Sequence, residues 1–497
     1  MLKKIGFIVL AAVSFVTGLF AQNVDDALRY SQIFYGGTAR FMSMGGAFTA
    51  LGGDISSLSQ NPAGIGVFRA SEITITPQLF HTNISAGFNS KITSDYLYNF
   101  NLSQAGIVSN LISNENETGL ITLNFGYSFN KTNNLNQSIR IEGTGTTSSM
   151  ADYWAQNSFG SLGGDLAGNE KNAYDAWLID TIAGSGGTSY GTVFSNYGDN
   201  PTSQYGQKIS RYVTNEGYTG EHALSIGGNY SNKIYFGATF GISTLKYSSH
   251  FEHSETAETT LDSKFQNFTY TDHYEQTGHG YSLKLGAIIK PIETVRIGVA
   301  FHSPTFYKID EYFYEDLTSK YTDGDHYEFS NEPMRYNYAL VTPFRALAGV
   351  AVQIKKFALL SADYEFVDYS IARFKETGDN YDYSVKNSLI KNSLKSASNV
   401  RLGGEFRFNK LYLRTGYGYY GKAFQSGDDN ADLDYSSISF GTGFREQNVS
   451  IDFAFTNFRY SQKNVLYPLD SSFDPSTVHL STVNNLFTLT IGYKFGY

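Results

Sequence analysis

The sequence ends in a stretch whose side chains alternate between apolar types and small or polar types. From Phe487 to Tyr497 every second residue is apolar or aromatic, and the residues between them are Thr, Gly or Lys. Successive residues of a β-strand point to opposite faces, so this strand has one apolar face and one polar face. The apolar face must meet an apolar medium, either a protein core or a membrane.

The same alternation recurs along the chain, for example in Val449–Phe455, Ile234–Ile242 and Val295–Phe301. It predicts fourteen strands, near residues 72–85, 118–130, 136–144, 220–231, 234–251, 264–290, 294–303, 336–354, 357–371, 397–408, 411–421, 435–446, 448–460 and 484–497. Tight turns alternate with long connections, at 86–117, 145–219, 252–263, 304–335, 372–396, 422–434 and 461–483. Short turns on one side and long loops on the other are typical of an outer-membrane β-barrel, whose apolar face meets lipid. The sequence therefore predicts an all-β transmembrane antiparallel barrel over residues 72–497.

The composition indicates a protein that contacts both water and an apolar medium. Charged residues are 17% of the chain and aromatic residues 16%, and cysteine is absent. The net charge of −9 argues against a nucleic-acid partner, which a basic surface would bind. Without cysteine the chain has no disulfide, thiol nucleophile or thiolate metal ligand.

The first 21 residues have the layout of a secretory signal peptide. Lys3 and Lys4 precede an apolar run from Ile5 to Phe20, and Ala21 supplies a small residue for cleavage. After Ala21 no stretch of 18 apolar residues follows, so no transmembrane helix is predicted. The mature chain is expected to be exported.

Residues 22–71 do not alternate and differ from the rest of the chain. They are rich in Gly, Ala and Ser, and they include Gly45-Gly46 and the turn Asn61-Pro62-Ala63. Glycine permits close backbone approach, and proline stiffens the turn and restricts Asn61. We interpret this segment as a compact element that packs inside something else.

The run from Ala39 to Gly64, ARFMSMGGAFTALGGDISSLSQNPAG, resembles the hatch of the long-chain fatty acid transporter (FadL-like) family, which includes hydrocarbon channels. The resemblance implies that residues 22–71 form a hatch inside the barrel, with Gly45, Gly46, Asp54, Asn61, Pro62 and Ala63 as its motif. It also implies a bacterial outer-membrane location, and a C-terminal strand that the barrel-assembly machinery recognises.

In that family a hydrophobic small molecule is captured by outer loops, passes into the lumen and leaves through the wall beside a kinked third strand. The resemblance implies the same route here, for long-chain fatty acids or related apolar compounds. The third predicted strand is 136–144, and Gly143 and Gly145 near its end are compatible with a bend.

Two groups of residues are candidate ligand contacts. The first comprises arginines on the polar face of predicted strands, which either bind a carboxylate or pair with lumen acids: Arg296, Arg401, Arg407, Arg414 and Arg445. The second is an outer hydrophobic groove in the segment 145–219, where two runs at helical spacing predict two short amphipathic helices, the first with Trp154 and the second with Trp177 and Leu178. A compact loop that packs its own aromatic side chains is the alternative for this segment.

No enzyme is predicted. The sequence has no phosphate-binding loop, no Gly-x-Ser-x-Gly elbow and no His-Glu-x-x-His run. His250 and His253 are three apart on a predicted strand and so face opposite sides, which argues against a metal site; no cofactor is expected. A non-transporting outer-membrane protein on the same fold, for adhesion or haemin binding, remains the alternative function.

Overall fold

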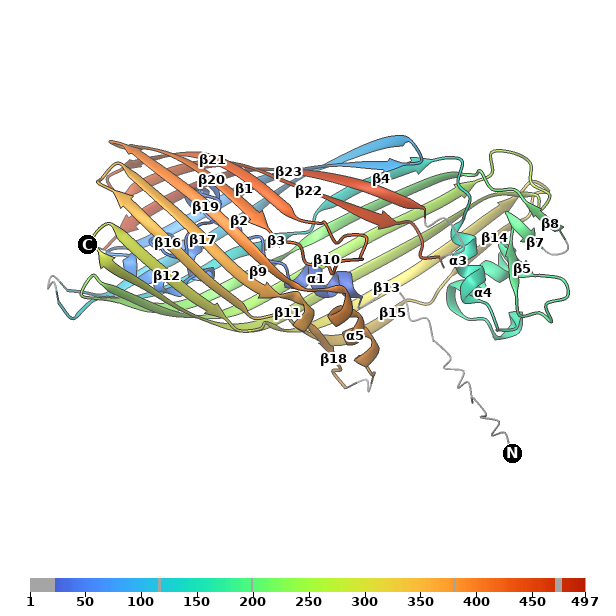
Figure 1. Ribbon diagram of the computed structural model, residues 1–497, viewed down its shortest axis with the longest axis horizontal. Coiled ribbons are helices and arrows are strands. Elements are labelled where there is room, and N and C mark those ends of the chain that lie inside the picture. The colour runs from blue at the N-terminus through green and yellow to red at the C-terminus, as the bar shows by residue number, and fades with distance from the viewer. Residues whose placement is uncertain (1–22, 115–117, 198–199, 379–380, 470–475, 497) are drawn as a thin grey trace, which may run out of the picture.

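The computed structural model describes residues 23–114, 118–197, 200–378, 381–469 and 476–496 (Figure 1). The predicted signal peptide, residues 1–21, and the terminal Tyr497 lie outside these ranges. Within the described ranges, no helix is both long enough and apolar enough to span a membrane.

Fourteen antiparallel crossings form one closed sheet, which confirms the predicted barrel. In chain order they are β1 (Ser71–Phe88), β2 (Lys91–Ser113), β3 with β4 (Leu120–Asn134, Gln137–Gly143), β9 (Lys208–Tyr230), β10 (Ile234–Thr256), β11 (Phe265–Ile292), β12 with β13 (Val295–His302, Phe306–Tyr321), β14 with β15 and β16 (His326–Ser330, Met334–Val341, Arg345–Ile354), β17 with β18 (Ala358–Asp368, Arg373–Lys375), β19 (Ser396–Phe408), β20 (Leu411–Tyr420), β21 (Tyr435–Glu446), β22 (Val449–Val465) and β23 (Thr477–Phe495). The sheet closes because β1 pairs with β2 on one side and with β23 on the other.

The number of crossings was predicted correctly, but one crossing was missed and another was counted as two strands. The predicted outer loop 86–117 is largely strand β2, which forms a hairpin with β1. The predicted strand 136–144 is β4, which continues β3 beyond a bend, so the tight turn expected at 130–135 does not exist. The bend is held by Asn136, whose amide donates to the side chain of Asn134 (2.6 Å) and to the backbone oxygen of Gly217 (3.1 Å).

The apolar faces of the strands point outward, as predicted. On β23, Ile491 is 48% exposed and Thr490 only 2%, and on β22 Phe453 is 42% exposed. Exposed apolar side chains continue around the outer surface on β10, β11, β12, β16 and β20. A closed barrel with such a belt satisfies its backbone hydrogen bonds internally and can face lipid. We call this surface the lipid belt.

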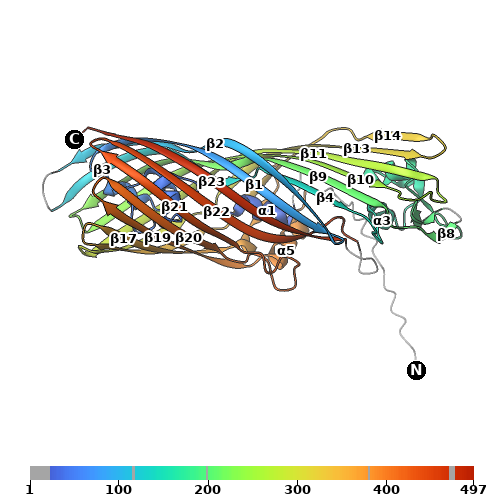
Figure 2. The ribbon, with the colours of Figure 1, turned by 90° about the horizontal axis from the view of Figure 1, so that it is seen from above.

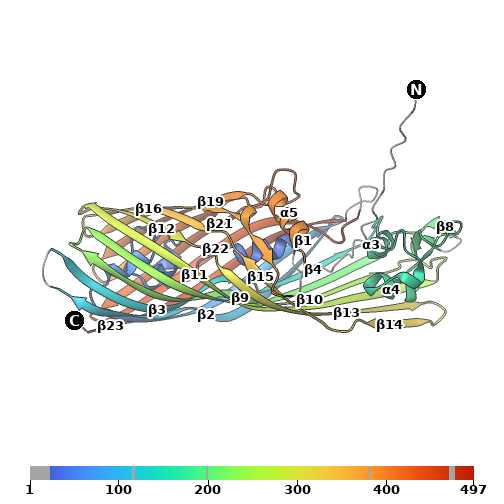
Figure 3. The same ribbon diagram turned by 90° about the horizontal axis from the view of Figure 1, so that it is seen from below.

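The barrel is much taller on one side than on the other (Figures 2 and 3). β11 has 28 residues, whereas β20 on the opposite side has 10. Much of the predicted loops 252–263, 304–335 and 461–483 therefore belongs to strands that extend beyond the lipid belt.

A small domain packs against the tall side, within the predicted loop 145–219 (Figure 1). It contains α3 (Met150–Asn157), η3 (Gly163–Asp165), α4 (Gly168–Asp175) and a four-stranded sheet of β5 (Ile179–Thr181), β6 (Tyr190–Thr192), β7 (Ser195–Tyr197) and β8 (Asn200–Ser203). We call residues 144–207 the cap. Ser149 and Asp152 form a capping box that fixes the start of α3.

The N-terminal segment, residues 23–70, contains α1 (Val24–Ser31), α2 (Ala39–Ser43), η1 (Ile55–Ser59) and η2 (Pro62–Val67). These helices are short, and each begins at a side-chain cap, namely Asn23, Thr38, Asp54 and Asn61. Figure 3 shows the segment in dark blue between the strands of the barrel.

Two further elements lie between β17 and β19. They are the short η4 (Tyr369–Ile371) and the helix α5 (Ser384–Ser393). Figure 1 shows α5 on the outside of the barrel, where the short strands end.

Candidate functional site: a chambered lumen

The inner wall of the barrel carries a band of glycines that fits the N-terminal segment. A Cβ atom at any of these positions would lie less than 3.0 Å from an atom of that segment: Gly237, Gly286, Gly298, Gly349, Gly403, Gly416 and Gly441. Strand glycines permit the close approach of another backbone. These residues were missed by the sequence analysis. Glycines recurring on the polar face of successive predicted strands were the signal that could have found them.

Gly45 and Gly46 lie where the N-terminal segment meets the wall. Gly45 has φ +63°, and a Cβ there would lie 2.9 Å from the backbone oxygen of Tyr417. Gly46 has φ +72°, and a Cβ there would lie 3.2 Å from the ring of Phe41. A side chain at Gly45 would therefore combine backbone strain with a clash against the wall.

The other motif residues hold the segment together. Asn61 donates to the backbone oxygen of Thr49 (2.6 Å) and accepts from the amide of Ala63 (3.1 Å). Asp54 accepts from the Thr38 hydroxyl (2.8 Å). Pro62 begins η2, where a missing backbone donor costs nothing.

The five candidate arginines have different surroundings. Arg414 pairs with Glu405 and Asp452 (2.6 Å each), and Arg296 donates to the backbone oxygen of Leu51 (2.7 Å). Arg407 and Arg445 lie with their guanidinium groups 5.5 and 4.7 Å from the ring centre of Tyr412.

Arg401 alone of the five lines the chamber described next. Its Nη2 atom pairs with Glu365 (2.5 Å), while its Nε and Nη1 atoms are buried without a hydrogen-bond partner in the described part of the chain.

A cavity of about 100 Å³ lies between the N-terminal segment and the wall. We call it the lower chamber. Its apolar lining includes Phe34, Phe80, Tyr420, Phe458 and Leu486. Phe34 packs edge-on against Tyr420 (5.0 Å) and Phe458 (5.1 Å). The chamber therefore combines an aromatic lining with the spare donors of Arg401.

A larger cavity of about 820 Å³, the upper chamber, opens on the outer side of the lower chamber. Its apolar lining includes Leu28 of α1, Ile139 and Ile141 of β4, and Val213 of β9. Both chambers are lined by the same central residues: Phe34, Phe80, Asn133, Asn134, Phe458 and Asn484. The two cavities thus adjoin at these six residues, Phe34 among them.

The wall is interrupted beside β3. The β2–β3 ladder runs from Gln104↔Asn130 to Ser113↔Thr122, and β4 pairs with β9. Among the described strands, β2 before Gln104 therefore has a ladder partner on one side only, β1. A recess of about 650 Å³ occupies this break and is lined by inward-facing Asn101 and outward-facing Leu102.

Lys131 joins this side recess to the lower chamber, because it lines both. Its Nζ atom lies 5.2 Å from the ring centre of Tyr218. The N-terminal segment contacts the same place, since Phe34 and Gly36 donate backbone hydrogen bonds to the carbonyls of Thr132 (2.7 Å) and Lys131 (2.8 Å). The bend in the third crossing is thus tied directly to the segment inside the barrel.

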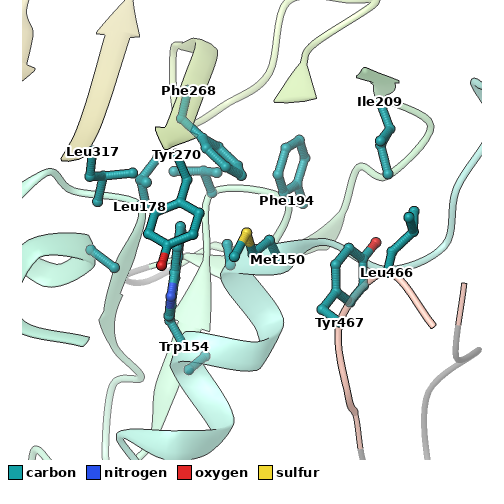
Figure 4. Close-up of a cluster of buried hydrophobic side chains, with 14 of the residues drawn as sticks. Met150, Trp154, Leu178, Phe194, Ile209, Phe268, Tyr270, Leu317, Leu466 and Tyr467 are labelled. Carbon is teal, nitrogen blue, oxygen red and sulfur yellow. The ribbon is translucent and has the colours of Figure 1, made fainter. Parts of the chain in front are cut away.

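The predicted outer groove is not formed. Trp154 (1% exposed) and Leu178 (0%) lie in the core of the cap, with Trp154 packed against Phe268 and Tyr270 of β11 (Figure 4). Trp177 points away and is 48% exposed. Only Trp154 lies in a helix, α3, and Trp177 and Leu178 follow the end of α4. Trp154 and Leu178 are buried in a core that also contains residues of the tall strands. The alternative, a compact segment packing its own aromatics, describes the cap better.

Burial in the cap changes the acidity of Asp152. This side chain accepts from the Ser149 amide (2.7 Å) and the Tyr205 hydroxyl (2.7 Å), and burial raises its pKa from 3.8 to about 7.

The stability of the cap should depend on pH through Asp152. The folded cap holds the proton of the Asp152 carboxyl more tightly than the unfolded chain does. Cap stability should therefore fall as pH rises from about 4 to about 7, by up to about 1.4 kcal/mol per pH unit. Hydrogen exchange of cap amides would measure it, and Asp152→Asn should remove the slope; an unchanged slope in that variant would contradict the assignment.

The glycine band gives a second prediction. Gly416→Val should displace the N-terminal segment, because a Cβ there would lie 2.1 Å from the amide nitrogen of Gly45. Influx of small polar solutes into proteoliposomes should then rise several-fold. Gly404→Val is the matched control. Apart from the two residues next to it in the sequence, the atom nearest to a Cβ at Gly404 would be in the side chain of Leu360, 3.5 Å away. Equal leakage through both variants would show that the contact between Gly45 and the barrel wall does not close the lumen.

The described residues contain no group of three His, Asp or Glu side chains that could hold a metal ion. His253 is buried and pairs with Glu255 (3.0 Å), whereas His250 faces outward.

No protein-family model matches the sequence, and no curated protein matches it. Solved structures do match. The Pseudomonas putida toluene transporter TodX is 13% identical, with 93% of this chain and 99% of that chain covered and a TM-score of 0.53. A Pseudomonas aeruginosa FadL homologue is 12% identical, with 94% and 100% covered and a TM-score of 0.54. At such identities the likeness concerns the fold. The chain therefore has the fold of TodX and of the FadL homologue, a closed β-barrel of fourteen antiparallel crossings.

Proposed function

We propose that this protein is an uptake channel for hydrophobic small molecules in the bacterial outer membrane. The observation that carries the proposal is the continuity of three cavities, namely the upper chamber, the lower chamber and the side recess, through shared lining residues. The neighbours in fold, TodX among them, are transporters by name, which supports a channel rather than an enzyme.

The proposed route starts at the outer mouth and ends at the wall. An apolar molecule would enter the upper chamber, pass Phe34 into the lower chamber and leave through the break beside β3. Such a path keeps an apolar molecule against Phe, Ile and Val side chains, and lateral exit avoids an aqueous pore. Lys131, shared by the lower chamber and the recess, marks the exit.

The N-terminal segment is proposed to act as a hatch. Phe34 separates the two chambers, and the backbone of Phe34 and Gly36 is bonded to the bend of β3. A ligand that displaces the backbone at Phe34 would therefore disturb hydrogen bonds to Lys131 and Thr132, which immediately precede the bend. Capture of the ligand and opening of the wall are coupled in this way.

The ligand class favoured by the lower chamber is an apolar molecule with a carboxylate, such as a long-chain fatty acid. Arg401 is 1% exposed and keeps two nitrogen atoms without a hydrogen-bond partner in the described chain. Buried donors without partners are costly, and a carboxylate would satisfy them. The aromatic lining would hold the tail.

Uptake of labelled oleate by proteoliposomes, and growth on oleate by a deletion strain complemented with the gene, test the proposal. We expect saturable uptake that empty vesicles and an unrelated porin do not support. A purified, correctly assembled protein that neither binds nor admits oleate or toluene would rule out the channel. The surface-binding alternative, in adhesion or haemin capture, would then take its place.

A further inference from the structure

The helix α5 leaves an apolar face uncovered on the outside of the barrel. Val385 (61% exposed) and Leu389 (52%) are four residues apart and so share one helix face. Tyr381 (47% exposed) lies in the segment just before the helix. The opposite face is buried through Ile390 in the core that also contains Leu28 and Tyr338. Two large apolar side chains on this ten-residue helix, and Tyr381 just before it, are thus exposed.

The position of α5 is fixed relative to the barrel wall. The Asn387 side chain accepts from the backbone amide of Phe374 (2.8 Å) and donates to its carbonyl (3.0 Å). Phe374 belongs to β18, which pairs with β15. The helix is therefore held beside a strand of the sheet, as Figures 1 and 3 show.

The ladder registers place this strand at the outer edge of the lipid belt. One row runs across four strands as Tyr281↔Phe306↔Val341↔Arg373, and both aromatic residues are exposed. Aromatic girdles at the interface are typical of outer-membrane barrels. The uncovered face of α5 is thus continuous with a surface that already faces lipid.

The next outward-facing row is basic. It runs as His279↔Lys308↔Ala339↔Lys375, and Lys308 and Lys375 are exposed. α5 adds an exposed Lys391. Within the described residues none of these three lysines has a carboxylate within 4.0 Å or donates a side-chain hydrogen bond. We call Lys308, Lys375 and Lys391 the basic rim.

We propose that α5 and the basic rim form a docking surface for anionic lipid of the outer leaflet. Tyr381, Val385 and Leu389 enter the boundary between headgroups and acyl chains, and the rim lysines bind lipid phosphates. A helix with an apolar face and flanking cations lies in this way in a membrane interface. Its continuity with the aromatic row favours lipid over a second copy of the chain or another protein.

The apolar contact can be tested by fluorescence quenching. Leu389→Trp is compared in vesicles of phosphatidylcholine with brominated acyl chains against Tyr364→Trp, a position in the lipid belt, and Leu162→Trp, an exposed position in the cap. The native Trp154 and Trp177 both lie in or beside the cap, and the unmutated protein supplies their background signal. We expect position 389 to be quenched like position 364. Quenching as weak as at position 162 would overturn the proposal, whether solvent or protein covers the helix.

The basic rim is tested by variants that remove its charge and leave the apolar side chains of α5 unchanged. In the Leu389→Trp background, addition of phosphatidylglycerol should increase quenching, and the further changes Lys308→Gln and Lys375→Gln should abolish that increase. Lys355→Gln with Lys356→Gln removes the same charge at the tight-turn end and serves as the control. An increase that survives the rim variant, or that the control also abolishes, would refute a specific role for these lysines. Heat-modifiability on gels confirms that each variant has assembled.

Discussion

Replacement of Arg401 by methionine is expected to lower the affinity for a long-chain fatty acid by about 10- to 100-fold, the value of a hydrogen bond to a charged group. The change keeps an unbranched apolar side chain and removes the guanidinium group with its two spare donors in the lower chamber. Glu365 retains its ion pair with Arg345 and its hydrogen bond from Asn399 (3.2 Å), so no buried carboxylate is left alone. Binding of labelled oleate to the purified protein measures the effect.

Two controls make this result specific. Uptake of toluene, which has no carboxylate, should be nearly unchanged in the same variant. The second control is Arg407→Met, which removes a charge from the same strand, β19. Arg407 is exposed, and its side chain donates a hydrogen bond to the Asn409 carbonyl (3.1 Å). Equal losses for oleate and toluene would mean that Arg401 shapes the chamber without binding the carboxylate.

Phe453→Arg is expected to prevent stable assembly in the membrane. Phe453 is 42% exposed on the lipid belt, and a cation near the bilayer midplane costs about 2–4 kcal/mol on the outer face of a barrel. The unfolding free energy in urea, followed in phospholipid vesicles, reports this loss. Heat-modifiability on gels gives a rapid first test.

Ser450→Arg is the matched control, because it lies three residues earlier on β22 and on the polar face. A defect as large as that of Phe453→Arg would contradict the assignment of the two faces. Thr490 also faces inward, yet it is a poor control. Its hydroxyl accepts a hydrogen bond from the amide of Ala39 (2.7 Å), so an arginine there would displace the N-terminal segment.

The faces of the strands could be predicted because a two-residue period is a local property. Ile491 and Thr490 differ in burial as the alternation requires, and the same holds for β10 and β12. The number of crossings was correct because two errors cancelled: β2 was missed, and β4 was counted as a strand of its own. Local patterning failed at residues 91–113, where Asn, Asp and Ser on the inward face of β2 made a strand look like a loop.

The candidate site was predicted less well, because its parts come from distant segments. Arg401 was one of five arginines with the same local pattern, and only the packed lumen distinguishes it. Of the five it alone lines the lower chamber, and two of its buried nitrogen atoms have no hydrogen-bond partner in the described chain. Trp154 and Leu178 belong to two separate runs at helical spacing, but the strands they pack against decide that both side chains lie in a core.

The sequence by itself determined the alternation that makes a barrel, the lipid-facing side chains and the distinct character of residues 22–71, since all of these depend on neighbours in the chain. The tertiary structure decided which chambers exist and how they connect. The band that includes Gly237 and Gly416 creates space only because successive strands align these residues around one lumen. The break beside β3 arises because β4 pairs with β9 rather than with β2, and strand pairing is a choice among distant partners that no local pattern contains.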